Sequence, residues 1–191
     1  METSLFQDLL AQAQDTGRLV AIYTNSPDPY QSCAVGYVDV LNGQEVRLRS
    51  VSRHGEDSGY DVVLIDDILR VEVDGAYERK VEFLRAHLRE WALPKELPPV
   101  PYNESILLTT LRQARENRLV VSLDTEDEEQ IITGFVHSVD SESVRILMVD
   151  SFGNDDGETA VRIAAIREMS CNSLTDQALR FLNAHKSYRE V

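Results

Sequence analysis

Histidine and cysteine are the residues best suited to metal binding and nucleophilic chemistry, and this chain carries four histidines and two cysteines. They do not form a His-x-x-x-His or Cys-x-x-Cys spacing, and neither a Gly-x-Ser-x-Gly motif nor a phosphate-binding glycine loop occurs. The sequence therefore predicts no catalytic residue, no metal site and no cofactor. We expect a protein that is not an enzyme.

Two of the histidines, His87 and His185, lie on the apolar faces of predicted helices in the two halves of the chain. One interpretation is a pair that senses pH or contacts a ligand. The other is a partly buried imidazole that bonds to a backbone carbonyl. We favour the second.

Two acidic segments could bind calcium or carry out acid–base chemistry. In residues 150–158, an EF-hand alignment on Gly157 would place Phe152 at the first ligand position, where it cannot coordinate. This segment is therefore predicted to be a turn. Residues 124–129 place five carboxylates in six positions, a pattern typical of a solvated loop.

Arginine and aromatic residues on the outer faces of predicted strands are the weak binding candidates: Tyr37, Arg47, Arg49, Phe135 and Arg145. The arginines could contact RNA phosphates, with the two aromatic rings as stacking platforms. Alternatively, they neutralise neighbouring carboxylates on a wet sheet face. The second role is the expected one, because each half of the chain has an excess of acidic residues.

The 191 residues carry a net charge of −14, divided evenly between the two halves. A uniformly negative protein repels phosphate backbones and anionic membranes, which disfavours RNA and membrane partners and favours a protein with a basic surface. The first residues lack the pattern of a signal peptide, and no apolar stretch is long enough to cross a membrane. We expect a cytoplasmic protein with two buried, reduced cysteines.

An internal repeat organises the whole chain. Arg18-Leu19-Val20 recurs as Arg118-Leu119-Val120, and after a shift of two residues the register holds at 98 residues. The matches that follow include Gly36 with Gly134, Gly55-x-Asp57-x-Gly59 with Gly153-x-Asp155-x-Gly157, and Phe83-Leu84-x-Ala86-His87 with Phe181-Leu182-x-Ala184-His185. A proline-rich linker at 94–101 separates repeat 1 (residues 1–93) from repeat 2 (residues 102–191).

Each repeat is predicted to contain five short strands between two helices, which gives an α+β fold that is mainly β. In the first repeat, Ser4 and Gln7 form a capping box and Gly17 ends the opening helix, with Asn117 at the corresponding position of the second. Strands are expected at 19–24, 33–41, 46–50, 60–65 and 68–73, with Asn42-Gly43 as a two-residue hairpin loop. One helix follows and carries Phe83 through Trp91. Gly36 lies inside a strand and would let the sheet bend into a closed barrel.

This pattern resembles the Sm/Lsm-like group of small SH3-type barrels, through Gly36-Tyr-Val…Val46-Arg-Leu and Ile65-x-x-Ile68-x-x-Val71. The resemblance implies a five-stranded barrel, strand pairing between subunits and binding of single-stranded RNA. However, the RNA-contacting Asp and Asn of the group would fall at Gly43 and Val46, or at Ser141 and Val144. Asp66-Asp67 and Ala164-Ala165 replace its Arg-Gly pair.

The expected protein is a non-catalytic binding or scaffold module that recognises a protein partner, either as a monomer or as a homodimer. The two barrels are expected to pack about a pseudo-two-fold axis. An RNA-binding Sm-like protein is the first alternative. A small-ligand sensor or enzyme is the second, and it would require a deep pocket with converging polar groups.

Overall fold

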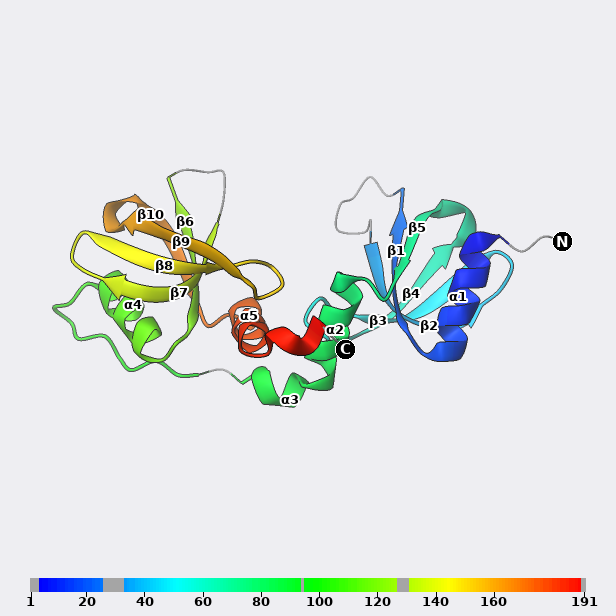
Figure 1. Cartoon of the computed structure of the whole chain (residues 1–191), viewed down its shortest axis with the longest axis horizontal. Coiled ribbons are helices and arrows are strands. Elements are labelled where there is room, and N and C mark those ends of the chain that lie inside the picture. The colour runs from blue at the N-terminus through cyan, green and yellow to red at the C-terminus, as the bar shows by residue number, and fades with distance from the viewer. Residues whose placement is uncertain (1–3, 26–32, 94, 127–130, 190–191) are drawn as a thin grey trace. The chain divides into compact units, whose positions relative to one another are not determined.

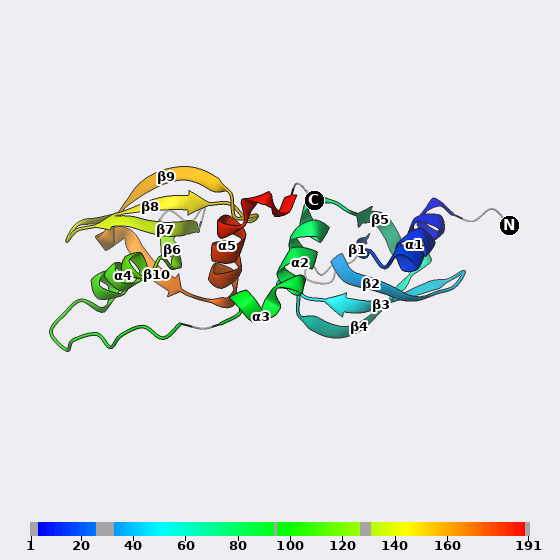
Figure 2. The same cartoon turned by 60° about the horizontal axis from the view of Figure 1, so that its bottom comes forward.

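The structure is a computed structural model that describes residues 4–25, 33–93, 95–126 and 131–189. The chain divides into two compact units, Met1–Leu88 with Arg189–Val191, and Arg89–Tyr188. Figures 1 and 2 show a five-stranded antiparallel sheet with helices against it in each unit. The fold is thus α+β and mainly β, as the sequence predicts.

The first unit begins with a helix and continues with a meander of strands. Its elements are α1 (Leu5–Thr16), β1 (Leu19–Thr24), β2 (Cys33–Leu41), β3 (Glu45–Val51), β4 (Asp57–Leu64), β5 (Ile68–Val73) and α2 (Ala76–Ala86). The short α3 (Leu88–Trp91) comes next in the chain, and from Arg89 onward it belongs to the second unit. The strand order is β4-β3-β2-β1-β5. A 3-10 turn, Ile65–Asp67, connects β4 to β5. Because β4 and β5 stand at the two ends of the strand order, they are the edges of the sheet.

The second unit repeats this arrangement. It contains α4 (Ile106–Glu116), β6 (Val120–Thr125), β7 (Ile132–Val139), β8 (Ser143–Val149), β9 (Asp155–Arg162), β10 (Ile166–Cys171) and α5 (Leu174–Ala184), with 3-10 turns at Ile163–Ala165 and Lys186–Arg189. The strand order, β10-β6-β7-β8-β9, is that of the first sheet. Segment 95–101 packs on this unit, because Leu97 contacts its core and Gln113 Nε2 donates to the Pro98 carbonyl at 2.9 Å.

Each sheet bends around an apolar core that the first helix of its unit covers. Alternate residues of the strands point into this core, as the period of two requires. Its buried members are Leu10, Ala13, Val20, Ile22, Val38, Val46, Leu48, Ile65 and Ile68 in the first unit, and Leu111, Ala114, Leu119, Val121, Leu123, Val136, Val144, Ile146 and Val161 in the second. In the first unit, α2 packs on the opposite face of the sheet through Val81, against Leu19 and Ala21.

The glycine inside β2 permits a close approach of two strands. A Cβ atom at Gly36 would lie 2.5 Å from the carbonyl oxygen of Arg49 on β3. Gly134 on β7 faces the Leu147 carbonyl in the same way. A side chain at either position would therefore push the strands apart where the sheet bends.

The two repeats align differently at the first strand from what the sequence comparison indicates. Val20 pairs with Gly36, whereas Val121 pairs with Gly134. The structural counterpart of Val20 is therefore Val121 and not Val120, which makes the shift between the copies three residues. It follows that Arg118 is the counterpart of Gly17.

The prediction that Asn117 provides a left-handed helix cap is wrong. Asn117 has a φ of −93°, while the next residue, Arg118, has a φ of 49°. Asn117 Nδ2 donates to the Gln113 carbonyl at 2.8 Å, and this bond ties its side chain to the last turn of α4. The left-handed residue therefore comes one position later than predicted. Gly17 itself has the predicted left-handed conformation, with a φ of 64°.

Two further predictions differ from the structure. The Asn42 N–H donates to the Glu45 carbonyl at 3.0 Å, so the central turn residues are Gly43 and Gln44. The Asn42 side chain sets this turn, because its Oδ1 accepts from the N–H groups of Gln44 and Glu45. The closing helix also does not continue to Trp91: α2 ends before His87, and Trp91 belongs to α3.

Candidate functional site

The candidate site is the outer face of β4, the edge strand of the first unit. Tyr60, Val62 and Leu64 alternate along the strand and therefore project from one face. Their exposed fractions are 64%, 61% and 49%. They lie opposite Arg49, Arg47 and Glu45 of β3. The edge thus presents three large apolar side chains beside a backbone that pairs with only one neighbouring strand within the described sheet.

The corresponding edge of the second unit is polar. Glu158 and Arg162 of β9 occupy the positions of Tyr60 and Leu64, and Ala160 occupies that of Val62. Charged side chains on an edge strand oppose pairing with another chain. The two copies therefore differ at the surface where a β-sheet most readily accepts a partner.

Carboxylates lie at both ends of this apolar stripe. Glu56 and Asp57 are exposed where β4 begins, and Asp66 and Asp67 are exposed in the turn after it. Asp57 forms an ion pair with Arg85 at 2.8 Å. The outer face of β4 is thus apolar in the middle, with carboxylates beyond both ends.

The arginines that the sequence nominates are largely occupied by neighbouring side chains. Arg47 forms an ion pair with Asp39 at 2.6 Å and lies over the Tyr60 ring at 5.4 Å. Arg145 donates to both carboxylate oxygens of Glu158, at 3.0 and 2.5 Å. These contacts are those of arginines that neutralise carboxylates on a wet sheet face.

Within the first unit, the structure brings Arg49 onto the ring of Tyr37. Arg49 and Arg85 lie near the Tyr37 ring, at 5.5 and 5.8 Å from its centre. Phe135, the counterpart of Tyr37, lies opposite Leu147 on β8 and lines a pocket that Arg145 does not line.

Each of the two repeated histidines bonds to a backbone carbonyl. The Nδ1 atoms of His87 and His185 lie 2.9 Å from the carbonyl oxygens of Phe83 and Phe181, one helical turn earlier. The favoured interpretation is thereby confirmed for His87, which is partly buried, whereas for His185 only the bond to the carbonyl is confirmed. His185 is nevertheless exposed and reaches the wall of a pocket.

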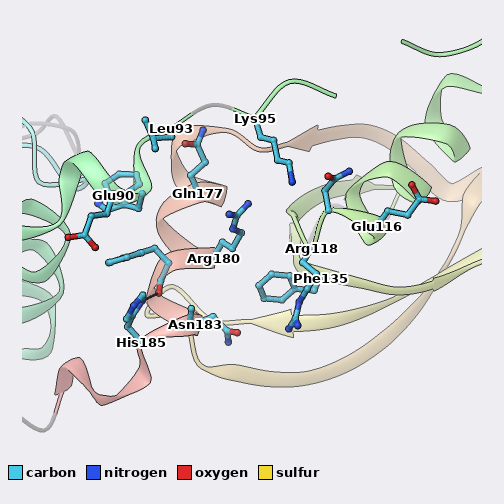
Figure 3. A pocket seen from close by; sticks show the side chains of 14 residues that line it. Glu90, Leu93, Lys95, Glu116, Arg118, Phe135, Gln177, Arg180, Asn183 and His185 are labelled. Carbon is cyan, nitrogen blue, oxygen red and sulfur yellow. Dashed lines mark hydrogen bonds between the residues drawn. The ribbon is translucent and has the colours of Figure 1, made fainter. Parts of the chain in front are cut away.

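That pocket lies within the second unit and has a volume of about 810 Å³. Figure 3 shows side chains from α3, α5, β7, the end of α4 and the segment around Lys95 gathered around it. Lys95, Arg118, Arg180 and Phe135 are prominent among them. Sequence reasoning missed this pocket, although a comparison of the repeats at Arg180, where the first copy has Glu82, would have indicated it.

The two acidic segments are only partly loops, since Asp124 and Thr125 end β6 and Asp155 begins β9. Asp150 Oδ1 accepts from the N–H groups of Phe152 and Asn154 at 2.8 Å, which makes residues 150–154 a turn. The remainder of the segment predicted to be a turn, residues 155–158, is the first half of β9. Of residues 124–129, positions 127–129 lie outside the described residues. Within the described part of the chain, there is no group of three or more His, Cys, Asp or Glu side chains that could hold a metal ion.

Both cysteines are free and half-buried, rather than fully buried as predicted. Burial raises the pKa of the Cys33 thiol, and it raises that of Cys171 to about 11. Neither thiol therefore has the lowered pKa of a catalytic cysteine.

Comparisons with known proteins give no further information on function, since no family model, curated protein or solved structure matches the chain. Among the described residues, no helix is long and apolar enough to cross a membrane. The functional argument therefore depends on the geometry of the two units.

Proposed function

We propose that the protein is a non-catalytic binding module whose first unit recognises a partner protein by adding an extended segment of that partner to β4. The observation that carries this proposal is the exposure of Tyr60, Val62 and Leu64 on an edge strand. In such strand addition, backbone hydrogen bonds provide affinity, and contacts to alternate side chains provide specificity.

The chemistry of the edge defines the segment that it would accept. Alternate apolar residues of the partner would cover the stripe of Tyr60, Val62 and Leu64 on one face of the sheet. Lysine or arginine at the ends of the segment would meet the carboxylates of Glu56 and Asp67. This complementarity favours an extended, basic-ended peptide over a second copy of this acidic chain.

We also propose that each unit is an Sm-like barrel. The helix followed by five strands, the edge positions of β4 and β5 and the 3-10 turn between them support this proposal. Strand pairing between subunits, which the resemblance implies, involves sheet edges of this kind. RNA binding at the strand arginines has less support, because Arg47 and Arg145 already pair with carboxylates.

The test uses the ¹⁵N-labelled full chain and a nine-residue peptide with valine at alternate positions and lysine at both ends. A peptide of the same composition with its valines adjacent is the control. We expect chemical-shift changes at the amides of β4 and weaker ones at β3, with micromolar affinity. The absence of binding, or equal binding of the control peptide, would refute the proposal.

The chain itself provides the matched variant. The triple substitution Tyr60→Glu, Val62→Ala and Leu64→Arg gives β4 the residues of β9 without changing the net charge. We expect it to fold and to lose peptide binding. If sedimentation shows a wild-type dimer that this variant abolishes, a second copy occupies the edge and the proposal of a different protein partner fails.

A further inference from the structure

The pocket of the second unit gathers positive charge in a strongly acidic chain. Lys95, Arg118 and Arg180 line it from three separate segments. In Figure 3 they lie between Glu90 and Glu116, which are at opposite ends of the pocket. None of the three cationic side chains has an ion pair or hydrogen bond with another residue in the described part of the chain. They are thus available to an anion.

The first unit shows that the fold does not require these charges. The counterparts of Arg118 and Arg180 are Gly17 and Glu82. The Glu82 carboxylate accepts from the Leu19 N–H at 3.3 Å. Two positions of the second copy thus carry arginine where the same scaffold is built with a neutral or acidic residue.

The neighbouring carboxylate also differs between the copies. In the first unit, Asp74 forms an ion pair with Arg18. Its counterpart in the second unit is Asn172, which is neutral and donates through Nδ2 to the Lys95 carbonyl at 3.1 Å. The second copy has thus lost an acidic group beside the segment that carries Lys95, so that an anion there would meet less repulsion.

An aromatic ring forms part of the same wall. The ring of Tyr37 in the first unit lies near Arg49 and Arg85. In the second unit, Phe135 takes the place of Tyr37, and Leu147 and Asn183 take the places of Arg49 and Arg85. Neither Leu147 nor Asn183 carries a charge. Phe135 can therefore offer its face to a flat ring of a ligand.

The pocket also contains an unused hydrogen-bond acceptor. Gln177 Nε2 donates to the Asn172 carbonyl at 2.9 Å, which orients the side-chain amide. Its Oε1 is buried and has no hydrogen-bond partner within the described residues. A buried acceptor without a partner is costly, and a donor on a ligand would satisfy it.

We propose that this pocket binds a nucleotide. Lys95, Arg118 and Arg180 contact the phosphate, Phe135 stacks on the base, and Gln177 Oε1 accepts from an N–H group of the ligand. A volume of about 810 Å³ is in the range of small-molecule sites. The proposal does not depend on strand addition at β4, which belongs to the other unit.

Isothermal titration of the full chain with AMP, ADP and ATP tests this inference, and adenosine and ribose 5-phosphate serve as the two halves of the ligand. We expect the nucleotides to bind more tightly than either half and to weaken as salt increases. Trp91 lines the pocket and is the single tryptophan of the chain, so its fluorescence should change on binding. The absence of binding at millimolar nucleotide, or equal affinity for ribose 5-phosphate, would overturn the proposal.

Variants that restore the residues of the first copy keep the test interpretable. Arg180→Glu and Arg118→Gly introduce groups that this scaffold already accommodates, so both proteins should fold. We expect Arg180→Glu to weaken nucleotide binding by about tenfold or more, as loss of a charge-assisted contact does. Arg112→Glu, at an exposed position of α4 outside the pocket, makes the same change of charge and should leave the affinity unchanged. Equal effects of the two glutamate variants would refute a specific site.

A hexa-adenylate RNA with a 5′-phosphate distinguishes the source of the nucleotide. Tighter binding of the RNA than of AMP would assign the pocket to an RNA end, and tighter binding of AMP would assign it to the free nucleotide. Either result supports nucleotide binding at this pocket, provided that Arg180→Glu weakens the binding by about tenfold or more. The triple variant of β4 should bind nucleotide normally, so that failure of one proposal is separable from failure of the other.

Discussion

Arg118 occupies in the second unit the backbone position that Gly17 occupies in the first. Their φ angles are 49° and 64°. The Gly17 N–H donates to the Gln14 carbonyl at 3.2 Å, and the Arg118 N–H donates to the Arg115 carbonyl at 3.1 Å. Glycine adopts this left-handed conformation without strain, whereas arginine does not. The second unit thus holds a strained residue at the pocket. Strained backbone residues are found mainly at functional sites.

Relief of this strain should stabilise the second unit. We expect Arg118→Gly to raise its free energy of unfolding by about 1 kcal/mol, the usual cost of a left-handed conformation for a residue with a Cβ. Gly17→Arg should lower that of the first unit by a similar amount. Hydrogen exchange at the slowest amides of α1 and α4 reports each unit separately, as a chain with two units requires. Unchanged exchange in both variants would contradict the strain argument.

Gly153 and Gly157 separate backbone strain from crowding, because both have a φ of 77°. A Cβ at Gly153 would lie 2.6 Å from Leu182 Cβ and 2.8 Å from the Asn183 nitrogen, whereas at Gly157 the nearest atom, Met148 Cε, is 4.0 Å away. We expect Gly157→Ala to cost about 1 kcal/mol of stability through strain alone. Gly153→Ala should cost about 1–3 kcal/mol more through overpacking. Urea denaturation, monitored through hydrogen exchange of the amides in β9 and α5, would measure the two losses of stability. Equal losses in the two variants would contradict the separation of strain from overpacking.

The sequence predicts the strands well because their signals are local. The alternation of Val46 and Leu48 with Arg47 indicates one buried face, and the structure shows that pattern. The errors occur where a side chain redirects the backbone. Asn42 moves the hairpin turn by one residue, and Asn117 delays the left-handed cap. Such side-chain bonds depend on the final geometry, so composition and spacing alone do not reveal them.

The candidate sites could be predicted only in part, for a different reason. The sequence indicates that Phe135 is on a strand, but only the fold brings it to the pocket that Lys95 and Arg180 also line. The sequence also does not predict the exposed face of β4, because the adjacent Val62 and Val63 are typical of a strand that is buried on both faces. Comparison of the two copies at Tyr60 and Glu158 would have indicated an edge with different chemistry.

Glu78 is a buried carboxylate with no hydrogen-bond partner in the described part of the first unit, and it is 1% exposed. Its counterpart, Asp176, accepts from the Ser122 hydroxyl at 3.0 Å and from the Ser173 N–H at 2.9 Å. Burial raises the pKa of Glu78, although the backbone N–H groups of Glu78 and Gly75 lie close enough to oppose this effect in part.

The stability of the first unit should therefore decrease as the pH rises. A carboxyl group whose pKa is higher in the folded state binds its proton more tightly there. Its contribution to the stability is therefore complete below the ordinary pKa of 4.5 and is lost as the pH rises through the raised pKa of the folded state. We expect Glu78→Gln to remove this loss and to be more stable than the wild type at pH 8. Hydrogen exchange of α2 amides between pH 4 and pH 8, corrected for intrinsic rates, would measure it. Glu45→Gln, at an exposed position, is the control, and an equal pH dependence of all three proteins would contradict the prediction.

Cys171 should react slowly as long as the second unit is folded. Burial, with a smaller contribution from the Asp176 carboxylate, raises its pKa from 9.0 to about 11. Because the thiolate is the reactive form, its population at pH 8 is about a hundredfold lower than that of an unperturbed thiol. In a Cys33→Ser variant, we expect slow reaction with a disulfide reagent at pH 8 and a rate that rises about tenfold per pH unit up to pH 10. Guanidinium should restore the rate of a free thiol. Fast reaction in the folded state, or a rate independent of pH, would show that the ionisation of Cys171 does not limit its reactivity.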